Sequence, residues 1–525
     1  MKTSFDSRTC VFAGLILLAA APVLAQLVDR NTATNALNEG IAKTYTEEIG
    51  AGRGDTNTPN SSLYIINRDP FRAVRRGRQL FQRKFTRAQG QGPVTGDGAG
   101  NINTDLAIGA GLSDSCAGCH GRPRGSAGFG GDVVTRPDSR DAPHLFGLGI
   151  KEMLADEITQ DLRAIRDKAM DRAKSDPVRL ALISKGISYG YISATKKGAV
   201  VTVDTSEVQG VDTDLRVRPF FAHGGTISIR EFVIGALNNE MGLQAVDPDT
   251  LTASGGGKVT TPSGMVLDGG KDAIEAPHVQ SATDDADGDG VVNEVPVSIV
   301  DFFEFYLLNY FKPGTYQQTF QSGHGRRLMD DIGCTTCHIA NLTINRDRRV
   351  ADVETVYDPT NGVFNNLFAT ASLLSNFSGT AFNLVSPDFN PFEVRNIFTD
   401  LKRHDLGPNF YERNYDGTTR KQFMTLPLWG VGSSAPYGHD GRSVNLMEVI
   451  LRHGGEAAST SAAFAARSDS DKEDLIAFLN TLVLFPPDDT ASNLNPANRN
   501  AAGFPQSGHG SIRLAALFRI PSDPE

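Results

Sequence analysis

Four of the five cysteines in this 525-residue chain belong to two copies of one short pattern. The first copy is Cys116-Ala-Gly-Cys119-His120, and the second is Cys334-Thr-Thr-Cys337-His338. On a helical turn, two thiols three residues apart can each form a thioether to a haem vinyl group, and the adjacent histidine can bind the iron. This pattern is typical of c-type haem attachment. The sequence therefore predicts two covalently bound haem c groups, haem one at the first motif and haem two at the second.

A four-cysteine zinc site and a redox-active cysteine pair are the alternative uses of this spacing. A zinc ribbon places its two pairs about 15–20 residues apart, whereas the two pairs here lie in different halves of the chain. Neither alternative explains why a histidine follows both pairs. Haem attachment is therefore the favoured interpretation.

Residues 1–25 have the form of a secretory signal peptide. Two basic residues precede an apolar run over residues 11–25, and a small residue closes the run. The run is shorter than the roughly 20 residues that a membrane-spanning helix needs, and no later stretch is long enough. We therefore expect an exported, periplasmic protein without a stable membrane span. An uncleaved N-terminal anchor is the alternative.

The composition, with 39% hydrophobic and 21% charged residues, is typical of a soluble protein. At about 100–200 residues per domain, the length allows two to four domains. Acidic residues outnumber basic ones, 61 to 51, which gives a formal net charge of −10. Because nucleic-acid-binding proteins normally carry a basic face, we expect no nucleic-acid partner.

The segments that must position the two motifs are predicted to be mainly helical. Over residues 151–174, apolar residues recur at spacings of three and four, as on one face of a helix. Similar patterns predict helices over residues 72–87, 229–243, 298–311 and 325–332. Residues 191–229 alternate and predict short strands or extended loops. The expected fold is mainly α, with two cytochrome c-like haem domains, long loops and a few short strands.

The expected domain order places one haem in each half of the mature chain. After the signal peptide (residues 1–25) come an N-terminal extension (26–75), the haem-one domain with insertions (76–300), the haem-two domain (301–485) and a C-terminal tail (486–525). The insertions between residues 175 and 300 suggest a substrate or partner surface, which a minimal electron carrier would not need.

Six further segments have recognisable patterns, and the strongest reads Ala-Pro-Tyr-Gly-His-Asp-Gly-Arg at residues 435–442. The others are residues 77–81, 144–149, 287–294, 399–405 and 427–430. Together with the haem motifs they resemble the bacterial di-haem oxidoreductases related to the di-haem cytochrome c peroxidases. The resemblance spans residues 75 to about 480 and is more specific near haem two than between the haems.

The resemblance implies that one haem reacts with peroxide while the other passes electrons to it. In that family haem two takes a methionine as its sixth ligand, and His453 stands at the matching position. The resemblance thus implies that His453 binds the haem-two iron, which would give a lower potential than methionine. The alternative is a polar residue at a helix C-terminus, where histidine meets the helix dipole favourably.

For haem one, the resemblance implies a catalytic glutamate. Glu240, Met241 and Gly242 match the family's motif, although its proline is absent. Glu240 would accept a proton from bound peroxide and return it to the leaving oxygen; a solvated side chain is the alternative. No histidine lies between residues 121 and 143. His144 is thus the nearest candidate for a second haem-one ligand, and an open iron is the alternative.

An acidic segment suggests a calcium site. Asp285, Asp287 and Asp289 place oxygen ligands at alternate positions, as at the start of an EF-hand loop. The usual glutamate at position twelve is replaced by Pro296, while Glu294 comes two residues early. The pattern favours a calcium loop of another type, formed by Asp285, Asp287, Asp289 and Glu294, over a solvated acidic turn.

These patterns lead to one expected function and two alternatives. We expect an exported di-haem oxidoreductase, cytochrome c peroxidase-like, that reduces hydrogen peroxide at haem one with electrons relayed through haem two. Its partners would be a small redox protein or other electron donor or acceptor, and peroxide or a small oxidisable substrate. The alternatives are an enzyme that oxidises another substrate and an electron-transfer cytochrome without substrate chemistry. A sixth protein ligand at haem one would favour the electron carrier.

Overall fold

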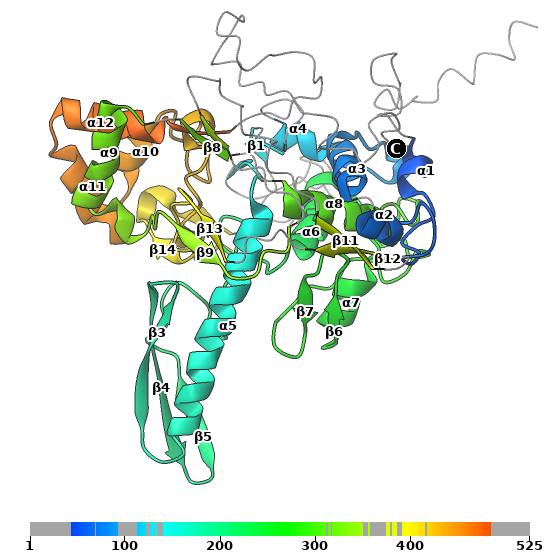
Figure 1. The fold of residues 1–525 in the computed structure, drawn as a ribbon, viewed down its shortest axis with the longest axis horizontal. Helices are drawn as coiled ribbons and strands as arrows, with labels where there is room; N and C mark the ends of the chain where they lie inside the picture. Colours follow the sequence, from blue (N-terminus) through cyan, green and yellow to red (C-terminus); the bar gives the residue numbers. More distant parts are fainter. Residues whose placement is uncertain are drawn as a thin grey trace, which may run out of the picture.

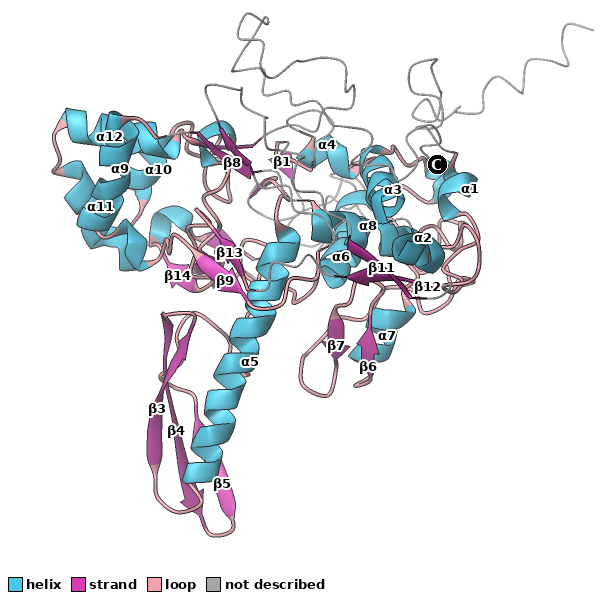
Figure 2. Ribbon diagram, in the orientation of Figure 1, coloured by secondary structure: helices cyan, strands magenta, loops and turns pink. Residues whose placement is uncertain are grey.

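The computed structural model describes residues 44–68, 70–92, 113–121, 127–130, 132–133, 140–310, 313–316, 318–349, 355–357, 374–378, 381–385, 391–414 and 417–484. Figure 1 shows two helical bodies, small sheets between them, and one long arm that projects away. Figure 2 shows strands along the arm, between the two bodies and at the lower side of the first body. The predicted signal peptide and C-terminal tail lie outside the described residues.

The first helical body surrounds one central apolar helix, α8 (Val297–Asn309). A helix that is apolar on all sides must be buried on all sides, and every residue of α8 after Val297 is buried. The helices of this body besides α8 are α1 (Tyr45–Ile49), α2 (Ser62–Arg68), α3 (Pro70–Gln82), α4 (Cys116–His120), α6 (Ile229–Met241) and α7 (Pro248–Ser254).

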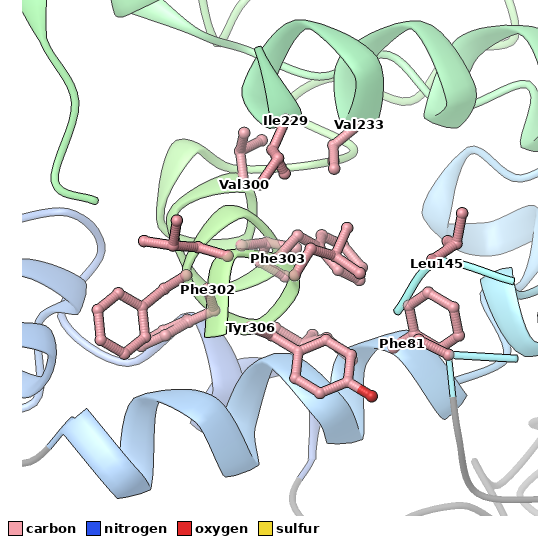
Figure 3. Close-up of a cluster of buried hydrophobic side chains, with 14 of the residues drawn as sticks. Phe81, Leu145, Ile229, Val233, Val300, Phe302, Phe303 and Tyr306 are labelled. Atoms are coloured by element: carbon pink, nitrogen blue, oxygen red, sulfur yellow. The ribbon is translucent and has the colours of Figure 1, made fainter. Parts of the chain in front are cut away.

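Close packing of α3 on α8 holds this core together. A side chain on Gly77 would collide with the carbonyl oxygen of Phe302 and with Tyr306, so glycine lets the two helices approach. Figure 3 shows Phe81 of α3 and Val233 of α6 among the side chains that gather around α8. Part of the predicted N-terminal extension joins this core, because Ile65 and Ile66 of α2 are buried in it.

A buried ion cluster stands behind the same helices. Arg230 of α6 is fully buried and donates to Asp247, to Asp301 and to Glu304 of α8. Ser62 of α2 also donates to Asp301, at 2.5 Å. Because Arg230 lies on α6, Ser62 on α2, and their shared partner Asp301 on α8, the cluster connects these three helices.

The second helical body contains α9 (Phe320–Asp331), α10 (Leu446–Arg452), α11 (Ala458–Ala465) and α12 (Asp469–Leu479). Its core is apolar and includes Leu328, Phe398, Phe464 and Phe478. Phe398 and Phe478 meet edge to face, with ring centroids 5.7 Å apart. This body therefore depends on apolar packing where the first also contains buried ions.

The arm consists of α5 (Leu148–Arg172) and the antiparallel sheet β3 (Val178–Ser184), β4 (Ile187–Lys197) and β5 (Val200–Asp204). Ile158 and Leu162 of α5 pack against the inner face of the sheet, which presents Leu182, Tyr189 and Ile192. In Figure 1, α5 starts in the body of the molecule and runs the length of the arm.

The remaining strands form small sheets. These pair β1 (Asp132–Val133) with β2 (Arg140–Asp141), β6 (Lys258–Thr260) with β7 (Val266–Asp268), β9 (Leu342–Ile344) with β13 (Phe392–Val394), β11 (Leu374–Ser378) with β12 (Ala381–Val385), β14 (Arg403–Asp405) with β17 (Gln422–Met424), and β15 (Glu412–Arg413) with β16 (Thr419–Arg420), while β8 (Pro313–Tyr316) lies between β10 (Thr355–Tyr357) and β18 (Leu482–Leu484).

The expectation of a mainly α fold is therefore correct only in part. Helices dominate the two bodies, but the described chain is mixed, with helices and several small sheets. Alternating β-branched residues such as those of β4 and β5 pair as strands once α5 covers their apolar face. Within the described ranges, none of the helices combines the length and apolar character that a membrane crossing requires.

Candidate functional site

Both cysteine motifs open into one cavity of about 590 Å³ between the two helical bodies. Most of its wall is aromatic and aliphatic, with residues from α6, from the segment after β2 and from α10. Every cysteine and histidine of the two motifs lines it: Cys116, Cys119, His120, Cys334, Cys337 and His338. A flat, largely apolar cofactor such as haem fits a wall of this kind.

Each motif forms a single tight turn. The first is α4, whose start is capped by Ser115, because its hydroxyl accepts the N–H of Gly118 at 3.1 Å. The second begins as a 3-10 turn, Cys334–Thr336. Burial raises the pKa of the Cys116 thiol to about 12 and that of Cys334 to about 11. Cys116 and Cys334 are thus neutral thiols, and both cysteines of each motif line the same cavity.

The histidines of the two motifs have the same hydrogen-bond arrangement. The Nδ1–H of His120 donates to the carbonyl oxygen of Pro143 at 2.6 Å, and that of His338 donates to Phe398 at 3.1 Å. Burial lowers the pKa of both imidazoles to about 4, so both are neutral at pH 7. A neutral ring held through Nδ1 presents Nε2 as a metal ligand.

His453 repeats this arrangement near the second motif. It caps the C-terminus of α10, where its Nδ1–H donates to the carbonyl oxygen of Val449 at 2.6 Å. Its side chain lines the cavity, and it lies close enough to His338 for its charge to contribute to the lowered pKa of that ring. The structure thus brings together the two histidines that the sequence assigned to one iron.

Glu240 lies near the first motif. It stands in the last turn of α6, and Gly242 (φ 66°) ends the helix in a conformation that favours glycine. The Glu240 carbonyl accepts the N–H of Ser113 at 3.1 Å, and its side chain lines the cavity. Burial and then the negative charge of Glu240 raise the pKa of Cys119. The structure therefore places this carboxylate within electrostatic reach of the first motif.

His144 belongs to the wall that carries His120. Its chain neighbour Pro143 accepts the His120 hydrogen bond. Burial and then the positive charge of Lys151 lower the pKa of His144 to about 3. Within the described chain, Nδ1 of His144 has no hydrogen-bond partner although it is buried.

A charged group that sequence reasoning did not identify as a unit lies beside the second motif. His404 hydrogen-bonds Asp400 at 2.8 Å and Glu456 at 2.7 Å. Burial lowers the pKa of His404, but these bonds outweigh it and raise the pKa to about 11. The Asp400 carboxylate in turn contributes to the electrostatics of His338. The spacing of four residues between Asp400 and His404 was the available signal for this pair.

The segments that carry β2 and β15 contact each other beside the cavity. Arg140 of β2 donates to both carboxylate oxygens of the buried Glu412, at 2.6 and 2.9 Å. The N–H of Asp141 donates to the carbonyl of His439, at 3.0 Å. His439 itself stacks on Phe423 with centroids 4.0 Å apart. These contacts fix the distance between the two halves of the cavity.

Three of the four residues predicted to form the calcium loop lie close together. Carboxylate oxygens of Asp285, Asp287 and Asp289 lie within 4.8 Å of one another. Glu294 is not part of that group; it accepts the N–H of Gln244 at 2.8 Å. Burial and the neighbouring aspartates raise the pKa of Glu294 to about 8, so these aspartates are near it.

Metal-ligand geometry does not support the zinc alternative. Among the described residues, the groups compact enough to hold a metal ion are Cys337, Asp400 and His404, and the three aspartates. The four motif cysteines do not form such a group. Their sulfur atoms are instead distributed in two pairs along one cavity wall, as attachment of two separate cofactors requires.

Residues 340–482 match the family model described as "Di-haem oxidoreductase, putative peroxidase". This confirms the resemblance to the di-haem oxidoreductases over the residues that follow the second motif. No curated protein matches the chain. Among solved structures, hydrazine synthase of Kuenenia stuttgartiensis, pressurized with 20 bar xenon, aligns with 82% of this chain and 95% of its own, at 13% identity and a TM-score of 0.35.

Proposed function

We propose, starting from the match of residues 340–482 to the di-haem oxidoreductase family model, that this chain is an exported, peroxidase-like enzyme with two c-type haems. It would reduce hydrogen peroxide at haem one, with electrons from a small redox protein relayed through haem two. One observation carries the proposal. A single cavity with an apolar wall is lined by both haem-attachment motifs.

The residues that would hold the two haems fit them. Each cysteine pair would form thioethers, and His120 and His338 would bind the irons through the Nε2 atoms that their backbone hydrogen bonds leave available. His453 would supply the second ligand at haem two through its own Nε2. When bound, the haems would supply the electrons for cleavage of the peroxide O–O bond.

Glu240 would move the proton in this reaction. Its carboxylate would accept the proton of the attacking peroxide oxygen and deliver it to the oxygen that leaves. The apolar side chains of α6 that line the same cavity, among them Phe232, Val233 and Leu237, would exclude water and so strengthen the electrostatic effect of this single carboxylate.

A calcium ion at the acidic segment would support the fold between α7 and α8. Asp285, Asp287 and Asp289 offer the oxygen ligands that calcium prefers. We expect added Ca²⁺ to raise the midpoint of thermal unfolding of the native chain. The midpoint of the Asp287→Asn variant should not change when Ca²⁺ is added. Equal midpoints with Ca²⁺ and with a chelator in the native chain would contradict a calcium site.

Low-temperature EPR of the fully haem-loaded ferric protein tests the peroxidase proposal. We expect one high-spin signal, from haem one, and one low-spin signal, from haem two with His338 and His453. Peroxide should remove the high-spin signal. Two low-spin signals that peroxide does not change, and that persist after one-electron reduction, would overturn the proposal in favour of an electron carrier.

A further inference from the structure

Lys151 is a buried cation that the proposed function does not use. It lies in the first turn of α5, and only 8% of the residue is exposed. The side chain lines the cavity. Lys151 contacts the ring of Phe220 and lies within electrostatic reach of His144. It therefore belongs to the part of the cavity that surrounds the first motif.

Within the described chain, the ammonium group of Lys151 has neither a carboxylate nor a carbonyl partner. The contact that it makes is with the ring of Phe220, whose centroid is 5.7 Å from Nζ. Other basic side chains that are buried or partly buried are paired with carboxylates, as in Arg230–Asp247, Arg348–Glu152, Arg83–Glu48 and Lys185–Glu157.

An unpaired ammonium group is unfavourable at this position for two reasons. Removal of a charge from water is costly unless a counter-charge replaces the lost solvation. The N-terminus of a helix also carries a partial positive charge, which repels a cation in the first turn. Burial lowers the pKa of Lys151 to about 8, so the group remains mainly protonated at neutral pH. Such a position is favourable only when an anion joins it.

His144 adds a second polar atom without a partner on the same wall. Its Nδ1 is buried and has no hydrogen-bond partner in the described part of the chain. The charge of Lys151 contributes to the lowered pKa of His144, and both residues line the same cavity. The His144 ring is hydrogen-bonded to the backbone of Trp429, but its Nδ1 atom and the Lys151 ammonium group lack partners in the described part of a wall that is mainly apolar.

We propose that Lys151, with His144 beside it, forms an anion site in the cavity wall and that the anion is a carboxylate. The carboxylate could come from one of two sources, and for the first of them the inference rests on the proposed function. A haem at the first motif would bring its own propionates into this cavity, whereas a small carboxylate substrate would enter from solvent. Either group would accept a charge-assisted hydrogen bond from the ammonium group, which is about twice as strong as a neutral one.

The test compares Lys151→Met and Lys151→Arg in the haem-loaded protein. Lys185→Met is the matched control, because the Lys185 side chain is also only 8% exposed but pairs with Glu157 on the arm and does not line the cavity. Two quantities are measured: the midpoint potential of haem one without added anion, and the affinity for acetate from the change in the haem-one absorption band.

A propionate partner predicts that Lys151→Met lowers the haem-one potential and that acetate causes no saturable change in the native protein. A substrate site predicts saturable acetate binding in the native protein, weakened by roughly tenfold or more in Lys151→Met. In both cases Lys151→Arg retains most of the native behaviour, and Lys185→Met retains all of it.

Two results would overturn the inference. Lys151→Met could match Lys185→Met in both quantities, which would mean that no anion depends on Lys151. Alternatively, EPR could show a haem one that is low spin in the native protein and high spin in Lys151→Met, which would make Lys151 an iron ligand. Neither quantity depends on peroxide turnover. A failure of the proposed function appears separately, as a native protein without two covalent haems or without a peroxide-sensitive EPR signal.

Discussion

The two motifs share one five-residue pattern, but the walls around them differ. Beside the second motif, His453 supplies another imidazole near His338, and His404 forms a charged group with two carboxylates. Beside the first motif, the wall is mainly apolar, and its charged side chains include Glu240 and Lys151. The attachment sequence therefore does not decide what each site does. The residues that the fold brings to each motif from elsewhere in the chain decide it.

Removal of one cysteine pair at a time separates the two sites most completely. Cys116→Ala with Cys119→Ala should reduce the covalent haem content from two to one, and so should the same change at the second motif. A pyridine haemochrome assay with mass spectrometry measures this. Only the first double variant should also lose the peroxide-sensitive signal. Loss of that signal from the second variant alone would reverse the assignment of the two haems.

Glu240→Gln should affect only the chemistry of the first site. Loss of a proton-transferring carboxylate lowers the rate by roughly 10²–10⁴-fold, so we expect kcat for peroxide to fall in that range with unchanged haem spectra. Glu207→Gln, an exposed change on the arm, is the control. Equal rates in the two variants would remove Glu240 from the mechanism.

The buried ion cluster makes the first body more sensitive to charge than the second. Arg230→Met would leave Asp247, Asp301 and Glu304 buried without their guanidinium partner. Loss of one partner from a buried ion pair costs roughly 3–5 kcal/mol. Chemical denaturation should show this loss in the free energy of unfolding of the first body, while the apolar second body unfolds as before.

Glu304→Gln refines that prediction through its pH dependence. Burial raises the pKa of Glu304 to about 7 from an ordinary value of 4.5. Because the folded state then holds the proton more tightly than the unfolded state, native stability falls as pH rises between these two values. The glutamine variant should lack this part of the fall. Thermal unfolding at pH 5 and pH 8 measures the difference, and parallel curves for both proteins would contradict the raised pKa.

His453→Met changes the second site without an expected loss of fold. Methionine in place of histidine raises the potential of a haem, so the potential of haem two should rise while that of haem one stays constant. His324→Gln is a suitable control, because His324 pairs with Asp474 in the second body and does not line the cavity. An unchanged haem-two potential would show that residue 453 does not bind its iron.

The fold could be predicted where one helix face is apolar. The helices α5, α6 and α8 follow the predicted ranges closely. The spacing of their apolar residues is a property of the local sequence and does not depend on the rest of the fold. The sheet of the arm was expected only as short strands or loops. Its strands are half-exposed, and what stabilises them is contact with α5, which depends on tertiary structure rather than on local pattern.

In the candidate site, the residues could be predicted but their partners could not. The two motifs identify themselves by spacing alone. The carbonyl groups that orient His120 and His338 belong to Pro143 and Phe398, and any residue can offer a carbonyl. Lys151 was predicted only as the first residue of a helix, because a single lysine at a helix start gives no indication that it is buried.

The helix α5 has 25 residues and no interruption, which at 1.5 Å per residue makes a rod of about 37 Å. One end carries Lys151 in the cavity wall, and the other end supports the sheet of the arm. Such a rod acts as a lever. A molecule that held the arm at its tip would turn the cavity end of α5 as well, because no loop in between absorbs the motion.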